Sequence, residues 1–166
     1  MRASRRMQAI QDPVIPLVNE LIRTHPGTLS LGQGMSFFGP PPGALARARA
    51  FGSEPRHHAY TPGQGLEPLR ELIARKLEAE NRTALGRDRA IIVTAGGNMA
   101  FLNSLFAITD PGDEVILPLP YYFNHEMALR MLNCLPVTVP TDGNHQLDLN
   151  RIEAAITMLM YGYFAF

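Results

Sequence analysis

The sequence predicts an α/β fold in which helices flank a mostly parallel sheet. After residue 90, strand-like and helix-like segments alternate. The helix-like segments are about ten residues long, which is typical of right-handed crossovers between parallel strands. Loops follow the first two predicted strands at 94–98 and 118–124. Ligands bind at the carboxyl ends of parallel strands, so these two loops are where we expect a functional site.

The elements of this second part are predicted from apolar periodicity and turn residues. In order they are a buried strand at 90–93, a helix at 97–108, a turn at 110–113, a strand at 114–117, a helix near 123–132, a strand at 135–139 and a helix near 149–156. Asp148 can cap the last helix.

The first ninety residues show fewer regular elements. Asp12-Pro13 can begin a helix that runs toward Arg23, and a short helix is predicted near 44–51. Residues 30–43 are dense in Gly and Pro and are predicted to be irregular. From Leu66 to Asn81 apolar residues recur at helical spacing, with charged residues between them.

Composition narrows the class of protein. Hydrophobic residues make up 46% and charged residues 18% of the chain, which is typical of a globular protein. The net charge is zero, so no field favours nucleic acid or an anionic membrane. Cys134 is the only cysteine, which argues against a zinc site or disulfides and indicates a small buried residue. We find no signal peptide and no membrane span, and we expect a cytoplasmic protein.

The stretch TAGGN, residues 94–98, lies where a strand-like segment changes to a helix. Free N–H groups and the helix dipole favour an anion there, and glycine lets a phosphate approach the backbone closely. Gly96, Gly97 and Asn98 are therefore candidates for a phosphate site. A tight turn without a ligand explains the same residues equally well, because neither G-x-G-x-x-G nor a P-loop is present.

Two loops carry tyrosines that can serve a ligand. Tyr121 and Tyr122 follow a predicted strand and can place a ring against a flat heteroaromatic group, although packing against the core is the favoured alternative. Tyr60 precedes a turn in AYTPGQG and can donate a hydrogen bond to an anion, or it can be an ordinary surface residue. The histidines are scattered, so we expect no metal site, and no nucleophile motif occurs.

Taken in order, these stretches resemble the class I/II aminotransferases, fold-type I enzymes that depend on pyridoxal phosphate. The N-terminal glycine loop of that family is similar to SLGQGMSFFGPPP, and its Y-x-x-x-x-G-x-x-x-L-R segment is similar to AYTPGQGLEPLREL. The phosphate turn, the next strand and the aromatic residue after it are similar to IIVTAGGNMAF and DPGDEVILPLPYY. The resemblance covers about residues 12–157.

The resemblance implies a role for five residues. Gly97 and Asn98 would offer backbone N–H groups to the cofactor phosphate, and Tyr122 would stack on the pyridine ring. Tyr60 would reach the phosphate of the neighbouring subunit in a homodimer, and Gly34 would lie beside the substrate carboxylate. The implied reaction transfers an amino group between an amino acid and a 2-oxo acid. The stretches LGQG and PYYFNHEM favour the branch with broad or aromatic substrates.

The resemblance also implies that this chain carries no catalytic residue. The family's Schiff-base lysine, the Asn of N-P-T-G, the Asp that pairs with the pyridinium and the Arg that grips the substrate lie beyond residue 166 in family order. Lys76 is the only lysine and lies on a charged, amphipathic helix, where we interpret it as solvated. We therefore expect a truncated or frame-shifted product that is inactive alone, with residues 158–166 read out of frame.

Three parts are expected along the chain: an N-terminal arm and small-domain segment at 1–50, the first part of the cofactor domain at 51–157, and an atypical apolar tail at 158–166. Two other interpretations stay open. The chain can be a non-catalytic fragment that at most binds phosphate or a full-length subunit, with exposed apolar surface and poor solubility. It can also belong to another pyridoxal phosphate enzyme, a lyase or decarboxylase.

Overall fold

The computed structural model describes residues 3–12, 14–32, 34 and 36–156. The apolar tail predicted at 158–166 lies outside the described residues. The chain divides into two compact units: residues 13–93 form one, and residues 1–12 with 94–166 form the other. This division does not test the domains predicted at 1–50 and 51–157, which stay a prediction.

The unit that contains residues 94–156 is built on a parallel pair of strands. β1 (Glu114–Leu119) and β2 (Leu135–Pro140) pair in a register that aligns Glu114 with Leu135 and Leu119 with Pro140. α6 (Phe123–Met131) lies between them in sequence and supplies the crossover that parallel strands require. The predicted alternation of strands and helices is therefore confirmed here.

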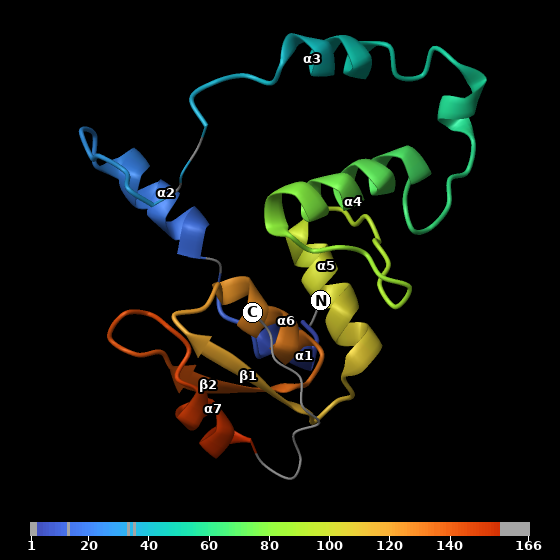
Figure 1. Ribbon diagram of the computed structural model, residues 1–166. Helices are drawn as coiled ribbons and strands as arrows, with labels where there is room; N and C mark the ends of the chain where they lie inside the picture. The colour runs from blue at the N-terminus through green and yellow to red at the C-terminus, as the bar shows by residue number, and fades with distance from the viewer. Residues whose placement is uncertain (1–2, 13, 33, 35, 157–166) are drawn as a thin grey trace. The chain divides into compact units, whose positions relative to one another are not determined.

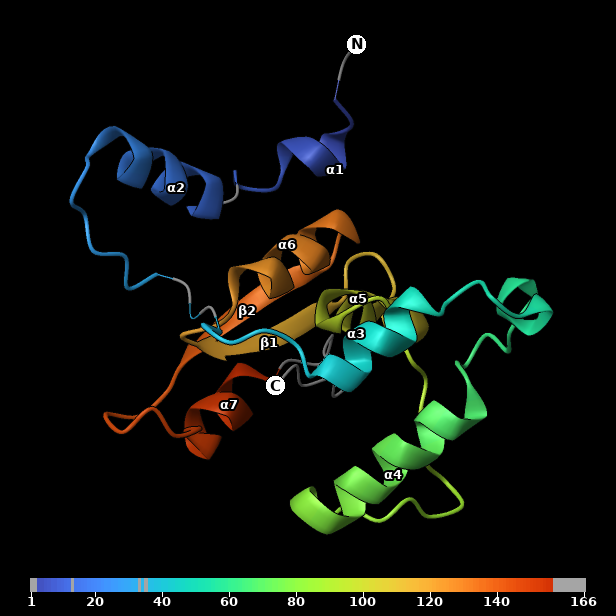
Figure 2. The same ribbon diagram turned by 90° about the horizontal axis from the view of Figure 1, so that it is seen from above.

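Helices cover both faces of this sheet, as Figures 1 and 2 show. On one face α5 (Gly97–Ile108) and α6 enclose the cluster Leu105, Val115, Leu117, Ala128, Leu129 and Cys134. On the other face α7 (Leu149–Ala155) closes the cluster Ile116, Val139 and Ile152. The division follows from strand geometry, because successive side chains point to opposite faces.

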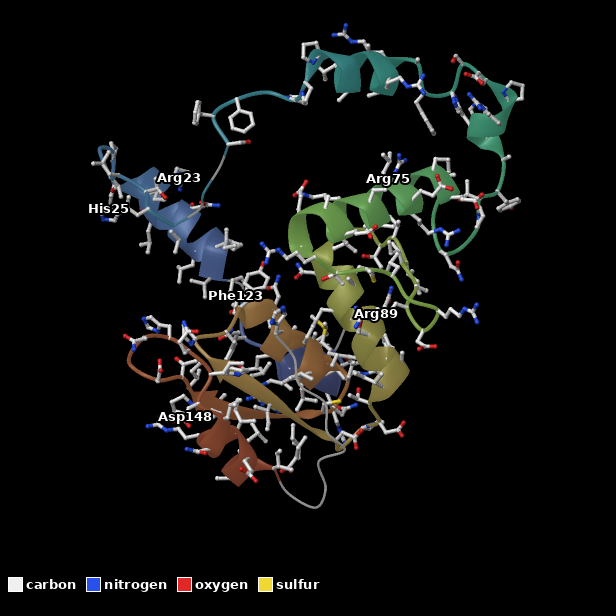
Figure 3. All side chains as sticks on the ribbon, in the orientation of Figure 1. Arg23, His25, Arg75, Arg89, Phe123 and Asp148 are labelled. Atoms are coloured by element: carbon white, nitrogen blue, oxygen red, sulfur yellow. The ribbon has the colours of Figure 1, made fainter. Side chains whose placement is uncertain are left out.

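Local signals fix the ends of these elements. The carboxylate of Asp148 accepts a hydrogen bond of 3.2 Å from the N–H of Arg151, which confirms the predicted cap of α7. Figure 3 labels Asp148 and Phe123 at the starts of α7 and α6. Cys134 is buried, as predicted. A short helix, α1 (Arg5–Gln8), contacts α6 in the same unit.

The unit of residues 13–93 consists of helices and connecting loops. Its elements are α2 (Val14–Thr24), α3 (Pro42–Arg49), the 3₁₀ helix η1 (Pro55–His58) and α4 (Glu67–Asn81). Among its described residues no side chain is fully buried, and Leu31, Phe37 and Tyr60 are almost wholly exposed. No helix in the described part of the chain is both long and apolar enough to cross a membrane.

The prediction of a buried strand at 90–93 is wrong. These residues are not part of a strand, and the side chain of Ile92 is 63% exposed. The N–H of Val93 donates a hydrogen bond of 3.0 Å to the carbonyl of Gln64, which lies in a loop. A strand exists only where a neighbour completes its hydrogen-bond ladder, and the recorded backbone bond of this segment goes to a turn instead.

Candidate functional site

The glycine turn before α5 leaves three backbone donors free. Gly96 is the N-cap residue, has φ +87°, and no side chain caps the helix. The first intrahelical bond runs from the N–H of Ala100 to the carbonyl of Gly96, at 3.2 Å. Among the described residues, the N–H groups of Gly97, Asn98 and Met99 have no hydrogen-bond partner. These donors lie at the positive end of the helix dipole.

The backbone conformation and the space around this turn explain why glycine occupies positions 96 and 97. The φ of Gly96 lies in the left-handed region, which side chains with a Cβ adopt at a cost. A Cβ added at Gly96 or Gly97 would meet no heavy atom within 4 Å, so open space borders the free N–H groups. The first turn of α5 holds no acidic residue that would repel an anion. The turn thus has the room and the charge that a phosphate requires.

Tyr122 lies in the loop after β1, which is the second predicted ligand loop. Its side chain is 47% exposed, and its hydroxyl accepts a hydrogen bond of 2.8 Å from Nδ2 of Asn124. The ring contacts Phe123 at a centroid distance of 4.9 Å and the edge of His125 at 5.6 Å. The ring is therefore held in place while part of it stays accessible.

His125 of α6 contacts both α5 and the ring of Tyr122. Its ring stacks on Phe101 of α5 with centroids 4.1 Å apart, and it also meets the Tyr122 ring at nearly a right angle. Burial lowers the pKa of His125 below its ordinary value, which favours the neutral ring that packs here. Sequence reasoning missed this residue, although its spacing of three from Tyr122 is the spacing of neighbours on a helix.

The adjacent tyrosines play different structural parts. Tyr121 packs against the core cluster of α5, α6 and β1, and its hydroxyl donates a hydrogen bond of 2.5 Å to Oε2 of Glu126. Arg130 donates to Oε1 of the same carboxylate at 2.8 and 2.6 Å. The Tyr121 hydroxyl and then Arg130 lower the pKa of Glu126, and Glu126 raises the pKa of Tyr121. Tyr121 is a packing residue, which leaves Tyr122 as the accessible one.

A groove with a volume of about 280 Å³ lies between α5 and α6. Apolar side chains line most of it, including Met99, Met127 and Met131, and the two polar residues are Asn98 and Asn124. The groove thus borders both the free donors of α5 and the loop of Tyr122. Among the described residues, no group of three or more His, Cys, Asp or Glu side chains could hold a metal ion.

The predicted site residues divide between the two units. Gly97, Asn98 and Tyr122 belong to the unit that contains the sheet. Tyr60 and Gly34 belong to the unit of residues 13–93, where the Tyr60 side chain is wholly exposed and Gly34 lies in an exposed loop. The contacts predicted for these five residues with cofactor and substrate stay predictions.

Comparison with known proteins identifies the family. The sequence profile described as aminotransferase class I and II matches residues 26–163. The chain belongs to this family. An aromatic aminotransferase of Arabidopsis thaliana is 34% identical over 136 residues, which are 82% of this chain and 34% of that protein. An aspartate/prephenate aminotransferase of Thermus thermophilus is 34% identical over 161 residues, or 93% of this chain and 41% of that protein.

Solved aminotransferase structures share the fold. The aspartate aminotransferase of Rhizobium meliloti superposes with a TM-score of 0.79 at 27% identity, covering 96% of this chain and 41% of that one. A mutant aspartate aminotransferase of Thermus thermophilus gives a TM-score of 0.77 at 34% identity, covering 96% and 43%. The predicted α/β class is confirmed, and this chain spans less than half the length of these aminotransferases.

Class I and II aminotransferases use pyridoxal phosphate, and they act on amino acids and 2-oxo acids. The only lysine of this family member, Lys76, lies on α4 and pairs with Glu80 one helical turn later. Its side chain is 63% exposed, so nothing in its surroundings removes it from water. The solvated lysine predicted from the sequence is confirmed.

Proposed function

We propose that this chain carries the phosphate-binding part of a pyridoxal-phosphate-dependent aminotransferase, which moves an amino group between an amino acid and a 2-oxo acid. One observation carries the proposal: three backbone N–H groups at the start of α5, those of Gly97, Asn98 and Met99, have no described partner, and a Cβ added at Gly96 or Gly97 would meet open space. Membership of the aminotransferase family supplies the identity of the phosphate.

The residues present fit this cofactor. The glycine turn offers donors and the positive end of a helix dipole to the phosphate, without an acidic side chain nearby in the helix. The partly exposed ring of Tyr122 offers a face for the pyridine ring. When bound, pyridoxal phosphate supplies an electron sink for negative charge that develops at the substrate Cα. The residues of this chain hold and orient the cofactor for that chemistry.

The remaining roles extend the proposal to the other unit. The Tyr60 hydroxyl would donate to the cofactor phosphate of the neighbouring subunit in a homodimer, and Gly34 would lie beside the substrate carboxylate. The full exposure of Tyr60, whose hydroxyl has no partner among the described residues, supports a contact outside its own chain.

The names of the relatives favour one type of reaction over the others. Those reported above are named aromatic and aspartate/prephenate aminotransferases, which favours transfer of an amino group over the lyase and decarboxylase alternatives. We propose that aromatic amino acids are among the substrates, in agreement with the stretches LGQG and PYYFNHEM.

Nuclear magnetic resonance tests the proposal directly. The ¹⁵N-labelled chain is titrated first with inorganic phosphate and then with pyridoxal phosphate. We expect the amide signals of Gly97, Asn98 and Met99 to shift in a saturable way with both, and pyridoxal phosphate alone to perturb Tyr122. Amides of α4 serve as the internal control. A wild-type chain whose α5 donors do not respond to millimolar phosphate would contradict the proposed function.

A further inference from the structure

Arg70 belongs to the segment AYTPGQGLEPLREL, but none of the roles described above uses it. It lies at the end of the first turn of α4, where the helix dipole disfavours a cation. Its Nη1 donates a hydrogen bond of 3.1 Å to Oε1 of Gln64. Its Nε is buried and has no hydrogen-bond partner among the described residues. Arg70 is thus placed unfavourably twice, near the positive end of the helix dipole and with a buried Nε–H that has no described partner. This placement suggests that its hydrogen bond to Gln64 has a structural role.

Gln64 extends this contact to a third segment. Its backbone carbonyl accepts a hydrogen bond of 3.0 Å from the N–H of Val93. Gly65 lies against the same residue: a Cβ at Gly65 would come within 2.8 Å of Cβ and Cγ2 of Val93, and φ is +98°. Helix α4 and Val93 are therefore joined at Gln64, whose side chain accepts from Arg70 and whose backbone carbonyl accepts from Val93.

Each end of this connection lies four residues from a residue with a proposed ligand contact, Gly97 or Tyr60. Val93 immediately precedes Thr94, the first residue of the glycine turn, and Gln64 lies four residues after Tyr60. One side chain on a regular helix thus restrains the loop that carries Tyr60 and the backbone that enters the turn. Regular elements are the parts of a fold that best hold such loops in place.

We propose that Arg70 is a positioning residue, which through Gln64 and Val93 holds the Tyr60 loop and the entry to the glycine turn in their phosphate-binding conformation. The inference rests on the proposed function. Arg70 itself contacts neither the phosphate nor the substrate. Arg75, on the same helix and labelled in Figure 3, provides a matched control, because it is exposed and has no described partner.

Hydrogen exchange of the 166-residue chain tests the connection without any ligand. In Arg70→Met the Val93 amide should exchange about fivefold faster, the effect of losing one hydrogen bond on a local opening. Gln64→Leu, which leaves the helix intact, should give the same change, and the double variant should add little to either. Arg70→Lys should recover part of the protection, and Arg75→Met should have no effect. Equal acceleration of amides throughout α4 would overturn the inference.

Phosphate affinity tests the purpose of the connection. The probe is inorganic phosphate, followed at the amides of Gly97 and Asn98. Arg70→Met and Gln64→Leu should weaken binding by about fivefold, whereas Arg75→Met should not. If the wild-type chain binds phosphate and both variants bind it with the same affinity, the positioning role of Arg70 is overturned while the proposed function stands. A wild-type chain that does not bind phosphate at these amides would overturn the proposed function and, with it, the positioning role.

Discussion

The hydroxyl of Tyr121 donates a hydrogen bond of 2.5 Å to Oε2 of Glu126, five residues later on α6. Arg130 completes the contact by donating to Oε1 of the same carboxylate. This contact ties the loop after β1 to the helix that follows it. Neighbouring side chains in an extended segment point in opposite directions, so anchoring Tyr121 inward leaves Tyr122 partly exposed.

Removing the Tyr121 hydroxyl should destabilise the sheet-containing unit. Tyr121→Phe deletes a hydrogen bond to a charged group and should lower the free energy of unfolding by about 1–2 kcal/mol, measured by urea denaturation. Tyr122→Phe, which loses only a contact with an exposed amide, is the control and should cost less. If Tyr121→Phe and Tyr122→Phe lower the free energy of unfolding equally, the Tyr121–Glu126 hydrogen bond does not stabilise the unit.

The same bond should make stability depend on acid pH. The pKa of Glu126 is lowered in the folded state by Tyr121 first and Arg130 second. The unfolded chain therefore binds this proton more readily, so the stabilisation is fully present above the ordinary pKa of 4.5 and is lost as pH falls through the folded value. Tyr121→Phe should flatten this loss in unfolding curves recorded across the acid range, and an identical slope in both proteins would contradict the prediction.

His125 should add a second pH dependence at a higher pH. Burial lowers its pKa below the ordinary value of 6.5, so the unfolded state takes up the proton first. Stability from this group is present above about pH 6.5 and declines as pH falls below it. His125→Phe keeps a ring against Phe101 and should abolish the decline. His145→Asn is the control, because His145 is exposed with φ +59°, which Asn tolerates.

Gly65→Ala should loosen the turn that meets Val93. The added Cβ would lie 2.8 Å from two side-chain atoms of Val93, and φ of +98° adds backbone strain. We expect a loss of about 1–3 kcal/mol, with faster hydrogen exchange at Val93. Gly63→Ala has no heavy atom within 4 Å of the new Cβ and should be close to neutral. Adding Val93→Ala removes Cγ2 but keeps Cβ, so it should relieve only part of the steric cost.

Asn98→Asp should separate helix stability from anion binding. A negative charge in the first turn of α5 interacts favourably with the helix dipole and should stabilise the unit by about 0.5 kcal/mol. The same charge opposes a phosphate at the neighbouring N–H groups and should weaken its binding by about tenfold or more. Thermal melting and phosphate titration measure the two effects, and a variant with unchanged phosphate affinity would place the anion elsewhere. Asn98→Ser, which stays neutral, is the control.

Lys76 should not bind pyridoxal phosphate covalently. It is exposed and paired with Glu80 on α4, so its amine lies in water and is engaged in an ion pair. After mixing the chain with pyridoxal phosphate and reducing with borohydride, peptide mass analysis should find no more label on Lys76 than on the N-terminal amine. Lys76→Arg should leave phosphate titrations unchanged. Selective labelling of Lys76 would overturn its assignment as a solvated residue.

The strands and helices after residue 96 could be predicted because their signals are local. The pair Gly96-Gly97, the turn at 110–113 and the cap at Asp148 each act within a few residues, and the structure places elements at those boundaries. Residues 90–93 show the same kind of apolar run and form no strand. Residues 90–93 differ from β1 and β2 in lacking a neighbouring strand in the described part of the chain, because a strand is completed only by hydrogen bonds from another segment.

The sequence by itself therefore determined the α/β class, the family, and the glycine turn and Tyr122 as candidate ligand contacts. Only the tertiary structure distinguished Tyr121 from Tyr122, brought His125 against Phe101, and joined Arg70 to Val93 through Gln64. Propensity and capping depend on neighbours along the chain, which a sequence displays directly. Stacking and side-chain hydrogen bonds join distant residues, and their partners are known only once the chain has folded.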